Sequence, residues 1–554
     1  MIKNPQNIIK NNAERILHGE VCYFSNSWFS LGLNYDWVTN PDSGYKYDSH
    51  KHWTEIEDLD PDKGDIKYVW EKSRFCFLYE IIRYDYHYNL DNSRFVFDVI
   101  LDWIDKNPLN CGPNYKCSQE ISVRILNWIF ALYFYKNSSY LNEFIFQKIL
   151  QSIYGQIKHL ENNINFSRIC VRNNHAITET LTLYLTSLLL PFFPGSNKRK
   201  KNGKKWFEQE IEFQVANDGT FIQNSMNYHR VLIQLLTWGI TIADIHGETY
   251  SKHIYDKAFK SINFLFQCQE ESNGWLPNYG ANDGALFFPL NSNDYRDYRP
   301  QLDALHQLLT GKSLYKEDFE DKKWYFTNKL KYHSYPLISK QYGIITFPDS
   351  GYYIFREDRT MSLIRCGSYN DKKSGSADCL HLDVWHNNEN ILLDGGSYKY
   401  NTENEIIEYF NGSESHNTVM LDQYGHMKKG IRFMWHNPPI INKVEVIEND
   451  KEYIFEANIQ SFTYLNTSIM VNRKINKLKG IPQWIIEDSI INKPNKLQLK
   501  QLWHTNSPKL LYETNGLIKE KIGKSSSYYG SYFETKQIEI QSNDNVIKTI
   551  ITII

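Results

Sequence analysis

The sequence has few features of a membrane protein, a disulfide-rich protein or a nucleic-acid-binding protein. Its most apolar run, residues 181–193, is shorter than the roughly 20 residues that a membrane-spanning helix needs. The eight cysteines form no CxxC pair and no zinc-finger spacing, so we expect reduced thiols. The formal net charge of −2 argues against general binding to nucleic acid or to anionic lipid. An anionic ligand must therefore meet a local cluster of cations.

The start of the chain lacks the charged-then-apolar layout of a signal peptide. We therefore expect a cytoplasmic protein, although a periplasmic or secreted protein whose leader had been removed would look the same. Aromatic side chains, by contrast, are abundant, with 39 Tyr, 30 Phe and 14 Trp. Many must be core, yet such a number also suits a groove that stacks sugar rings and bonds their edges.

From about residue 70 to 330, apolar residues recur at helical spacing. The clearest segments are 69–86, 93–107, 118–135, 142–160 and 175–190, and further helices are expected near 205–217, 228–246 and 255–270. Short turn-forming stretches separate them, and we interpret the basic stretch 198–205 as a loop. Successive paired helices with short connections predict an (α/α) toroid, that is, an incomplete barrel.

After about residue 335 the pattern changes to short β-branched or aromatic segments divided by Gly, Asn, Asp and Lys. Such segments run from residue 351 to 492, and a last one covers 545–554. They predict a large antiparallel β-sandwich. We place the boundary within residues 331–342, which divides the chain into a catalytic toroid (1–335) and a sandwich (336–554).

Four polar clusters could carry chemistry. One precedes a strongly periodic helix, where a single Asn would be an ordinary N-cap, and a second opens another apolar helix. A third is a turn-rich polar loop at residues 277–284, and the fourth lies on predicted strands of the sandwich. In order, their members include Asn173, Asn174 and His175; Tyr228, His229 and Arg230; Tyr279 and Asn282; and His381, Asp394 and His416.

The order of these clusters resembles the heparinase II/III-like polysaccharide lyases, which include heparan-sulfate and alginate lyases. An Asn/His pair opens one toroid helix, and Tyr-His-Arg opens another about 54 residues later. The sandwich then carries Asp-x-Leu-His-x-Asp-x-Trp, Asp-Gly-Gly-x-Tyr and His-Asn-Thr-Val. The segment with Glu120 and Arg124, one turn apart, looks like the substrate-side helix of the family. The resemblance covers most of the chain and implies a site between the two domains.

The resemblance implies β-elimination, in which a lyase removes the C5 proton of a uronic acid and expels O4. The carboxylate must then be neutralised by close donors. By resemblance, Asn174 neutralises it, with His175 assisting or acting as a base on one epimer. Tyr228 protonates the leaving oxygen and can also take the C5 proton. We expect His381 to be a second base or neutraliser, and His229, Arg230 or His381 to favour the Tyr228 phenolate.

The other residues predicted to contact substrate, an anionic polysaccharide or oligosaccharide, are Glu120, Arg124, Asn173, His229, Arg230, Tyr279 and Asn282. The chemistry requires no cofactor. Some members of the family hold a structural metal whose ligands match Asp394 and His416, but a third position, usually His, is Ser376 here. A zinc or calcium ion in the sandwich is therefore a hypothesis.

Two other functions stay open. A glycoside hydrolase on the same toroid needs two opposed carboxylic acids, for which Glu120, Asp218 and Asp283 are candidates. A non-catalytic protein that binds glycans during surface-polysaccharide assembly needs no catalytic group. The sequence indicates neither the particular sugar nor the oligomeric state.

Overall fold

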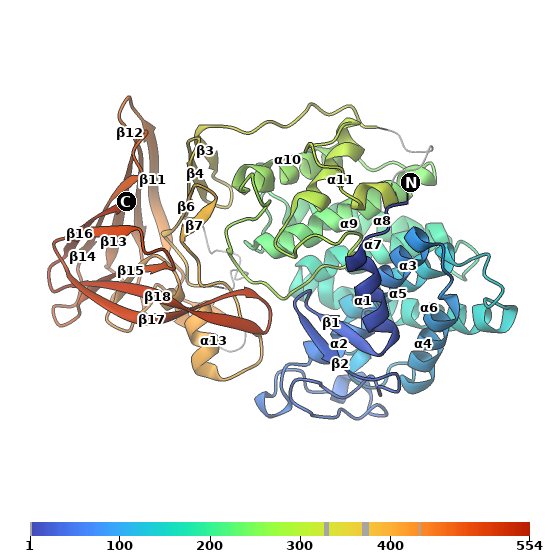
Figure 1. The fold of residues 1–554 in the computed structure, drawn as a ribbon. Coiled ribbons are helices and arrows are strands. Elements are labelled where there is room, and N and C mark those ends of the chain that lie inside the picture. The colour runs from blue at the N-terminus through green and yellow to red at the C-terminus, as the bar shows by residue number, and fades with distance from the viewer. Residues whose placement is uncertain (1–2, 326–331, 368–375, 431–433) are drawn as a thin grey trace.

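The computed structural model describes residues 3–325, 332–367, 376–430 and 434–554. Helices form the first part of the chain and antiparallel sheets the second (Figure 1), which confirms the predicted toroid followed by a sandwich. The last described helix of the toroid ends at Tyr325, and the first strand of the sandwich begins at Gly343. One further helix, α13 (Asn404–Asn411), lies within the sandwich. Within these described ranges, no helix combines the length and the apolar character that crossing a membrane requires.

The toroid consists of amphipathic helices whose apolar faces meet in two adjoining cores. Three helices in the middle, α5, α7 and α9, bury nearly all of their residues. Two of them begin at candidate clusters, because α7 starts at Asn174 and α9 at Met226. The longer helices are α1 (Asn7–Leu17), α2 (Lys67–Ser73), α3 (Leu78–Tyr88), α4 (Ser93–Lys106), α5 (Ser118–Phe134), α6 (Glu143–Asn165), α7 (Asn174–Leu189), α8 (Ser196–Gln214), α9 (Met226–Ile245), α10 (Lys252–Cys268), α11 (Arg299–Thr310) and α12 (Asp321–Tyr325).

Two helix predictions are wrong in detail. The segment 69–86 is not one helix, because the chain breaks between α2 and α3, where Phe75 has a φ of +62°. The basic stretch 198–205 is not a loop, because α8 begins at Ser196 and includes it. Two of its lysines, Lys200 and Lys204, form ion pairs with Glu248.

The described part of the sandwich contains three large antiparallel sheets and a two-stranded one, in which β9 (Lys428–Lys429) pairs with β10 (Trp435–His436). A six-stranded sheet has the order β11-β12-β13-β14-β19-β16, a four-stranded sheet β17-β18-β15-β8, and a five-stranded sheet β3-β4-β5-β6-β7. The strands are β3 (Gly343–Phe347), β4 (Tyr352–Arg356), β5 (Thr360–Arg365), β6 (His381–His386), β7 (Glu389–Leu392), β8 (Val419–Leu421), β11 (Ile440–Glu448), β12 (Glu452–Gln460), β13 (Met470–Leu478), β14 (Gln483–Ile491), β15 (Leu499–Thr505), β16 (Leu510–Thr514), β17 (Leu517–Tyr528), β18 (Ser531–Ser542) and β19 (Val546–Ile553).

The five-stranded sheet is the layer that joins the two domains, and Figure 1 shows it between the helices and the outer sheets. On β4, Ile354 packs into the toroid core, whereas its neighbour Phe355 packs into the sandwich core. Both faces are covered, so every residue of β4 is buried. On β6, Trp385 belongs to the toroid core, and the two-residue period places His381 on the same face.

The close contact between α7 and α8 depends on a glycine. A Cβ at Gly203 would lie 2.7 Å from the backbone nitrogen of Tyr184, which cannot move aside as a side chain can. We expect Gly203→Ala to lower the free energy of unfolding by about 1–3 kcal/mol through overpacking, despite the better helix propensity of Ala. Denaturant unfolding measures this.

Gly155→Ala is the matched control, because its Cβ would meet only the end of the Leu109 side chain, at 3.1 Å. That variant should be neutral or slightly stabilising. Equal unfolding free energies for the two variants would contradict the proposed backbone contact.

Candidate active site at the domain junction

Tyr228 lies at the start of α9. The Ser225 hydroxyl caps this helix by accepting a hydrogen bond from the Tyr228 backbone N–H at 3.1 Å. The Tyr228 hydroxyl lies 2.5 Å from that of Tyr400, which belongs to the sandwich. Burial, the Asp283 charge and Tyr400 together raise the pKa of Tyr228 well above 10. Tyr228 therefore holds its proton at neutral pH, bonded to a group from the other domain.

A network of buried charges surrounds this tyrosine pair. Lys67 Nζ lies 2.5 Å from Asp283 Oδ2 and 5.2 Å from the Tyr400 ring centroid. Arg74 donates twice to Glu120, at 2.5 and 2.8 Å. Burial opposes ionisation of Asp283 and Glu120, but Lys67 and Arg74 outweigh it and lower the pKa of both carboxyls. Both carboxylates are therefore ionised and paired.

The start of α7 supplies the Asn/His pair. Asn173 is the N-cap, since its side-chain oxygen accepts from the His175 backbone N–H at 2.9 Å. Asn174 is 2% exposed, and no hydrogen bond of its side-chain amide occurs within the described part of the chain. The ordinary capping role thus accounts for Asn173 and leaves the Asn174 amide available to a ligand.

His175 is neutral in this environment. Its Nδ1 lies 3.8 Å from the Cys117 sulfur, and burial lowers its pKa to about 4. The charges that act on this pKa are Glu120, Lys67, Asp283 and Arg74, the same network that adjoins Tyr228. Burial also raises the pKa of the Cys117 thiol to about 12, so the Cys117–His175 pair carries no net charge at neutral pH.

Four residues predicted to contact substrate have side-chain partners within the toroid. His229 stacks on Phe264 with ring centroids 5.3 Å apart, and Arg230 bonds the Tyr295 carbonyl. Glu120 is held by Arg74, and Arg124 is 0% exposed with its Nε donating to Gln156. The expectation that nearby cations favour the Tyr228 phenolate is wrong for this structure, because its pKa is raised.

His381 belongs to a separate cluster of residues, near Tyr279 of the 277–284 loop. It is 0% exposed, and it joins Asp394 and His416 in a cluster whose ligand-capable atoms all lie within 4.8 Å of one another. Its Nδ1 accepts from the Asn417 backbone N–H at 3.0 Å, and its Nε2 lies 3.5 Å from Asp394 Oδ2. No contact joins it to Tyr228 within the described residues. The structure therefore places His381 with the predicted metal ligands and away from the tyrosine pair.

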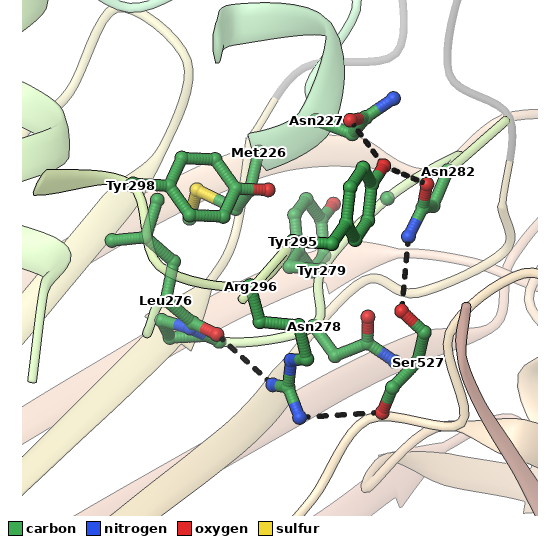
Figure 2. Close-up of a pocket in the computed structure, with 12 residues that line it drawn as sticks. Met226, Asn227, Leu276, Asn278, Tyr279, Asn282, Tyr295, Arg296, Tyr298 and Ser527 are labelled. Atoms are coloured by element: carbon green, nitrogen blue, oxygen red, sulfur yellow. Dashed lines mark hydrogen bonds between the residues drawn. The ribbon is translucent and has the colours of Figure 1, made fainter. Parts of the chain in front are cut away.

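Tyr279 and Asn282 line a pocket next to Tyr228 (Figure 2). The Tyr279 hydroxyl accepts from Arg365 Nε at 2.8 Å, and its ring centroid lies 6.4 Å from that of His381. The Asn282 oxygen accepts from the Tyr295 hydroxyl at 2.7 Å, and its amide donates to the Ser527 carbonyl of the sandwich at 3.3 Å. Both are therefore at the domain junction, as predicted.

Sequence reasoning missed Tyr400 and Lys67, and it considered Asp283 only as a candidate carboxylate of a hydrolase. Tyr400 has a detectable signal, because it follows the Asp394-Gly395-Gly396 turn by four residues and could be read as part of the same motif. Lys67 and Asp283 are 216 positions apart, and no pattern in the chain pairs them. Their contact exists only in the folded toroid.

Helices followed by antiparallel sheets are also the fold of solved heparinase III structures. A crystal structure of heparinase III superimposes with a TM-score of 0.66 at 14% identity, covering 91% of this chain and 79% of that one. Two family models match this chain, the heparinase II/III N-terminus at residues 10–265 and the heparinase II/III-like C-terminal region at residues 340–542. The chain belongs to the heparinase II/III family.

Two curated relatives are both named heparin-sulfate lyase. The protein from Bacteroides stercoris is 24% identical over 266 residues, or 45% of this chain. The protein from Bacteroides thetaiotaomicron is 20% identical over 439 residues, or 71% of this chain. The matches span 36% and 58% of the two relatives' own lengths.

The lowered pKa of His175 predicts a measurable titration. An unfolded histidine titrates near pH 6.5, whereas the folded ring should stay neutral down to about pH 4. Its contribution to stability is therefore complete above about pH 6.5 and is lost as the pH falls through about 4. Histidine NMR, with His175→Gln to assign the signal, measures this pKa. A midpoint near 6.5 in the folded protein would rule out the neutral, buried ring.

Proposed function

We propose that the chain is a polysaccharide lyase that cleaves a uronic-acid-containing polysaccharide by β-elimination. The observation that carries this proposal is the hydrogen bond between Tyr228 and Tyr400 at 2.5 Å, beside a neutral His175 and the free amide of Asn174. The names of the two relatives support an anionic polysaccharide as the substrate class. Neutral donors and a protonated phenol are the groups that elimination next to a carboxylate requires.

In the proposed reaction, the Asn174 amide donates to the uronate carboxylate and stabilises the charge that develops on it. The neutral imidazole of His175 accepts the C5 proton, because it is unprotonated at neutral pH. The electron pair of the C5–H bond forms the C4–C5 double bond as the C4–O4 bond breaks. Tyr228 gives its proton to O4, which leaves as a hydroxyl. Tyr400, which is hydrogen-bonded to Tyr228, then returns a proton to it.

The charge network opposes a hydrolase on the same toroid. A glycoside hydrolase needs one carboxylic acid that is protonated at the working pH. Asp283 and Glu120 are bound to Lys67 and Arg74, and the pKa of each carboxyl is lowered. The third candidate, Asp218, accepts hydrogen bonds from Thr220 and from the Asp349 backbone, in an exposed loop. These carboxylates suit a structural role.

Tyr228→Phe tests the proposed acid. It keeps the ring and removes the proton, so we expect kcat to fall by roughly 10²–10⁴-fold with oligosaccharide binding changed by no more than a few-fold. The assay is ultraviolet absorbance of the unsaturated uronate, measured on a panel of sulfated and unsulfated uronic-acid polysaccharides. Calorimetry with a short oligosaccharide measures binding.

Tyr512→Phe is the matched control, because it removes a buried hydroxyl that has no partner within the described sandwich. It should leave turnover unchanged. Full activity in Tyr228→Phe would remove this residue from the mechanism. Shorter chains without ultraviolet absorbance would indicate hydrolysis, and binding without any cleavage by the wild type would indicate a glycan-binding protein.

We also propose that His381, Asp394 and His416 hold a structural divalent cation, outside the chemistry. His381 Nε2 and His416 Nε2 are buried without a hydrogen-bond partner among the described residues, which is costly unless a ligand is bound. Two imidazoles and one carboxylate suit zinc better than calcium, which prefers oxygen ligands. In this proposal, His381 is the third ligand in place of Ser376.

Metal analysis of the purified full chain tests this proposal. We expect about one zinc per chain, and its loss in His381→Ala together with a lower midpoint of thermal unfolding. His386→Asn, at the other end of the same strand, is the control and should keep the metal. Failure of the wild type to bind added zinc, or full zinc retention in His381→Ala, would refute the assignment.

A further inference from the structure

A pocket at the domain junction adjoins the proposed acid. Its lining begins with Met226 and Asn227, the two residues that precede Tyr228 on α9. The loop at 276–280 forms one wall, and Ser527 of the sandwich closes another, as Figure 2 shows. The free space inside the pocket is about 10 Å³, which is room for one small group such as an oxyanion and not for a whole sugar ring. Asn227 links the pocket to the proposed acid, because its side-chain amide donates at 3.1 Å to Asp283, whose charge acts on Tyr228.

Arg296 is the only charged residue that lines this described pocket. Two of its five N–H donors make hydrogen bonds, and both bonds are long. One nitrogen lies 3.3 Å from the Ser527 hydroxyl and another 3.4 Å from the Leu276 carbonyl (Figure 2). Within the described residues, no carboxylate lies within ion-pair distance of it. Donors of this guanidinium are therefore free to bind a ligand.

The contrast with Arg74 and Arg473 shows what Arg296 lacks. Each of those buried arginines donates to a carboxylate at 2.5–2.8 Å. Arg296 instead stacks on Trp275, with its guanidinium carbon 4.2 Å from the ring centroid, and burial lowers its pKa. A partly desolvated cation without an anion is unfavourable, and an incoming anion relieves that cost.

The surroundings of the pocket also select for negative charge. Its lining contains no Asp or Glu. The two nearest acidic residues along the chain have other partners, since Asp297 accepts from Arg299 Nε at 2.9 Å and Asp294 accepts from the Tyr528 hydroxyl at 2.9 Å. A second arginine, Arg230, lies behind the Tyr295 and Tyr298 rings, 4.2 and 4.3 Å from their centroids, and adds positive potential. Tyr rings beside a cation suit an acidic sugar, because a ring face can stack while the oxyanion meets the guanidinium.

We propose that Arg296 at this pocket is a subsite that binds the oxyanion of an acidic sugar, with the sugar itself at the mouth of the pocket. This inference rests on the proposed lyase function. The oxyanion is a carboxylate of a uronic acid or a sulfate of a neighbouring sugar, each of which presents two oxygens that a guanidinium can bind. Arg296 is then a specificity-determining residue, and it takes no part in the proton transfers.

Steady-state kinetics of Arg296→Gln test the subsite. Losing a charge-assisted bond should raise KM by roughly 10–100-fold while kcat stays within a few-fold. Arg296→Lys keeps the positive charge but loses the paired donors of the guanidinium. Its KM should therefore lie between those of the wild type and Arg296→Gln. Arg299→Gln is the matched control three residues later, since Arg299 is already paired with Asp297 at 2.9 Å; its KM should not change.

Inorganic sulfate serves as a probe that does not depend on turnover. It should bind the wild type in calorimetry and inhibit it competitively, and both effects should be lost in Arg296→Gln. Comparing a sulfated polysaccharide with its desulfated form separates the two sources: a KM change on both indicates the carboxylate, and a change on the sulfated form alone indicates sulfate.

The failures of the two proposals are distinguishable. If the wild type releases unsaturated product but Arg296→Gln has an unchanged KM and sulfate affinity, the subsite is refuted and the lyase proposal stands. If the wild type releases none, the lyase proposal fails. Sulfate and oligosaccharide binding to the wild type and Arg296→Gln then decide the subsite alone, and equal affinities refute it.

Discussion

The site depends on one constraint, that charges buried at the domain junction must be paired. Lys67 with Asp283 and Arg74 with Glu120 tie α2, α5 and the 277–284 loop to one another. Removing one partner would leave a buried charge without compensation, so these elements cannot shift independently. Burial is the largest cause of the pKa shifts of His175 and Tyr228, and the Asp283 charge acts on both. The network therefore fixes the elements that carry the proposed catalytic groups, and their burial sets their protonation.

Periodicity predicted most of the fold because burial of one face leaves a regular trace in the sequence. It failed where tertiary contacts override that trace. The break at Phe75 places a non-glycine residue at positive φ, which no propensity favours. Strands β17 and β18 were missed because much of each is exposed and carries Lys, Glu and Ser without strict alternation. Strand β18 is positioned by pairing with β15, and β17 by pairing with β18.

The part of the candidate site that lies at the starts of helices could be predicted from the sequence. Asn174, His175 and Tyr228 open apolar helices, where a polar cluster stands out against the pattern that follows. A residue that reaches the site from outside the four clusters leaves no such signal, as Lys67 shows. His381 illustrates the converse: the sequence places it at the junction, and only the structure shows that it is buried with Asp394 and His416.

The contact between Tyr228 and Tyr400 makes domain closure part of the proposed chemistry. Asp65 of the toroid binds the Tyr529 hydroxyl and accepts from the Tyr400 and Asn401 backbones, so the sandwich turn that carries Tyr400 is fixed only when the domains meet. At 2.5 Å no atom fits between the two hydroxyls. Either hydroxyl can be the donor in this contact. With Tyr400 as the donor, Tyr228 keeps its own proton for the sugar oxygen, and Tyr400 returns a proton to Tyr228 while the domains stay closed.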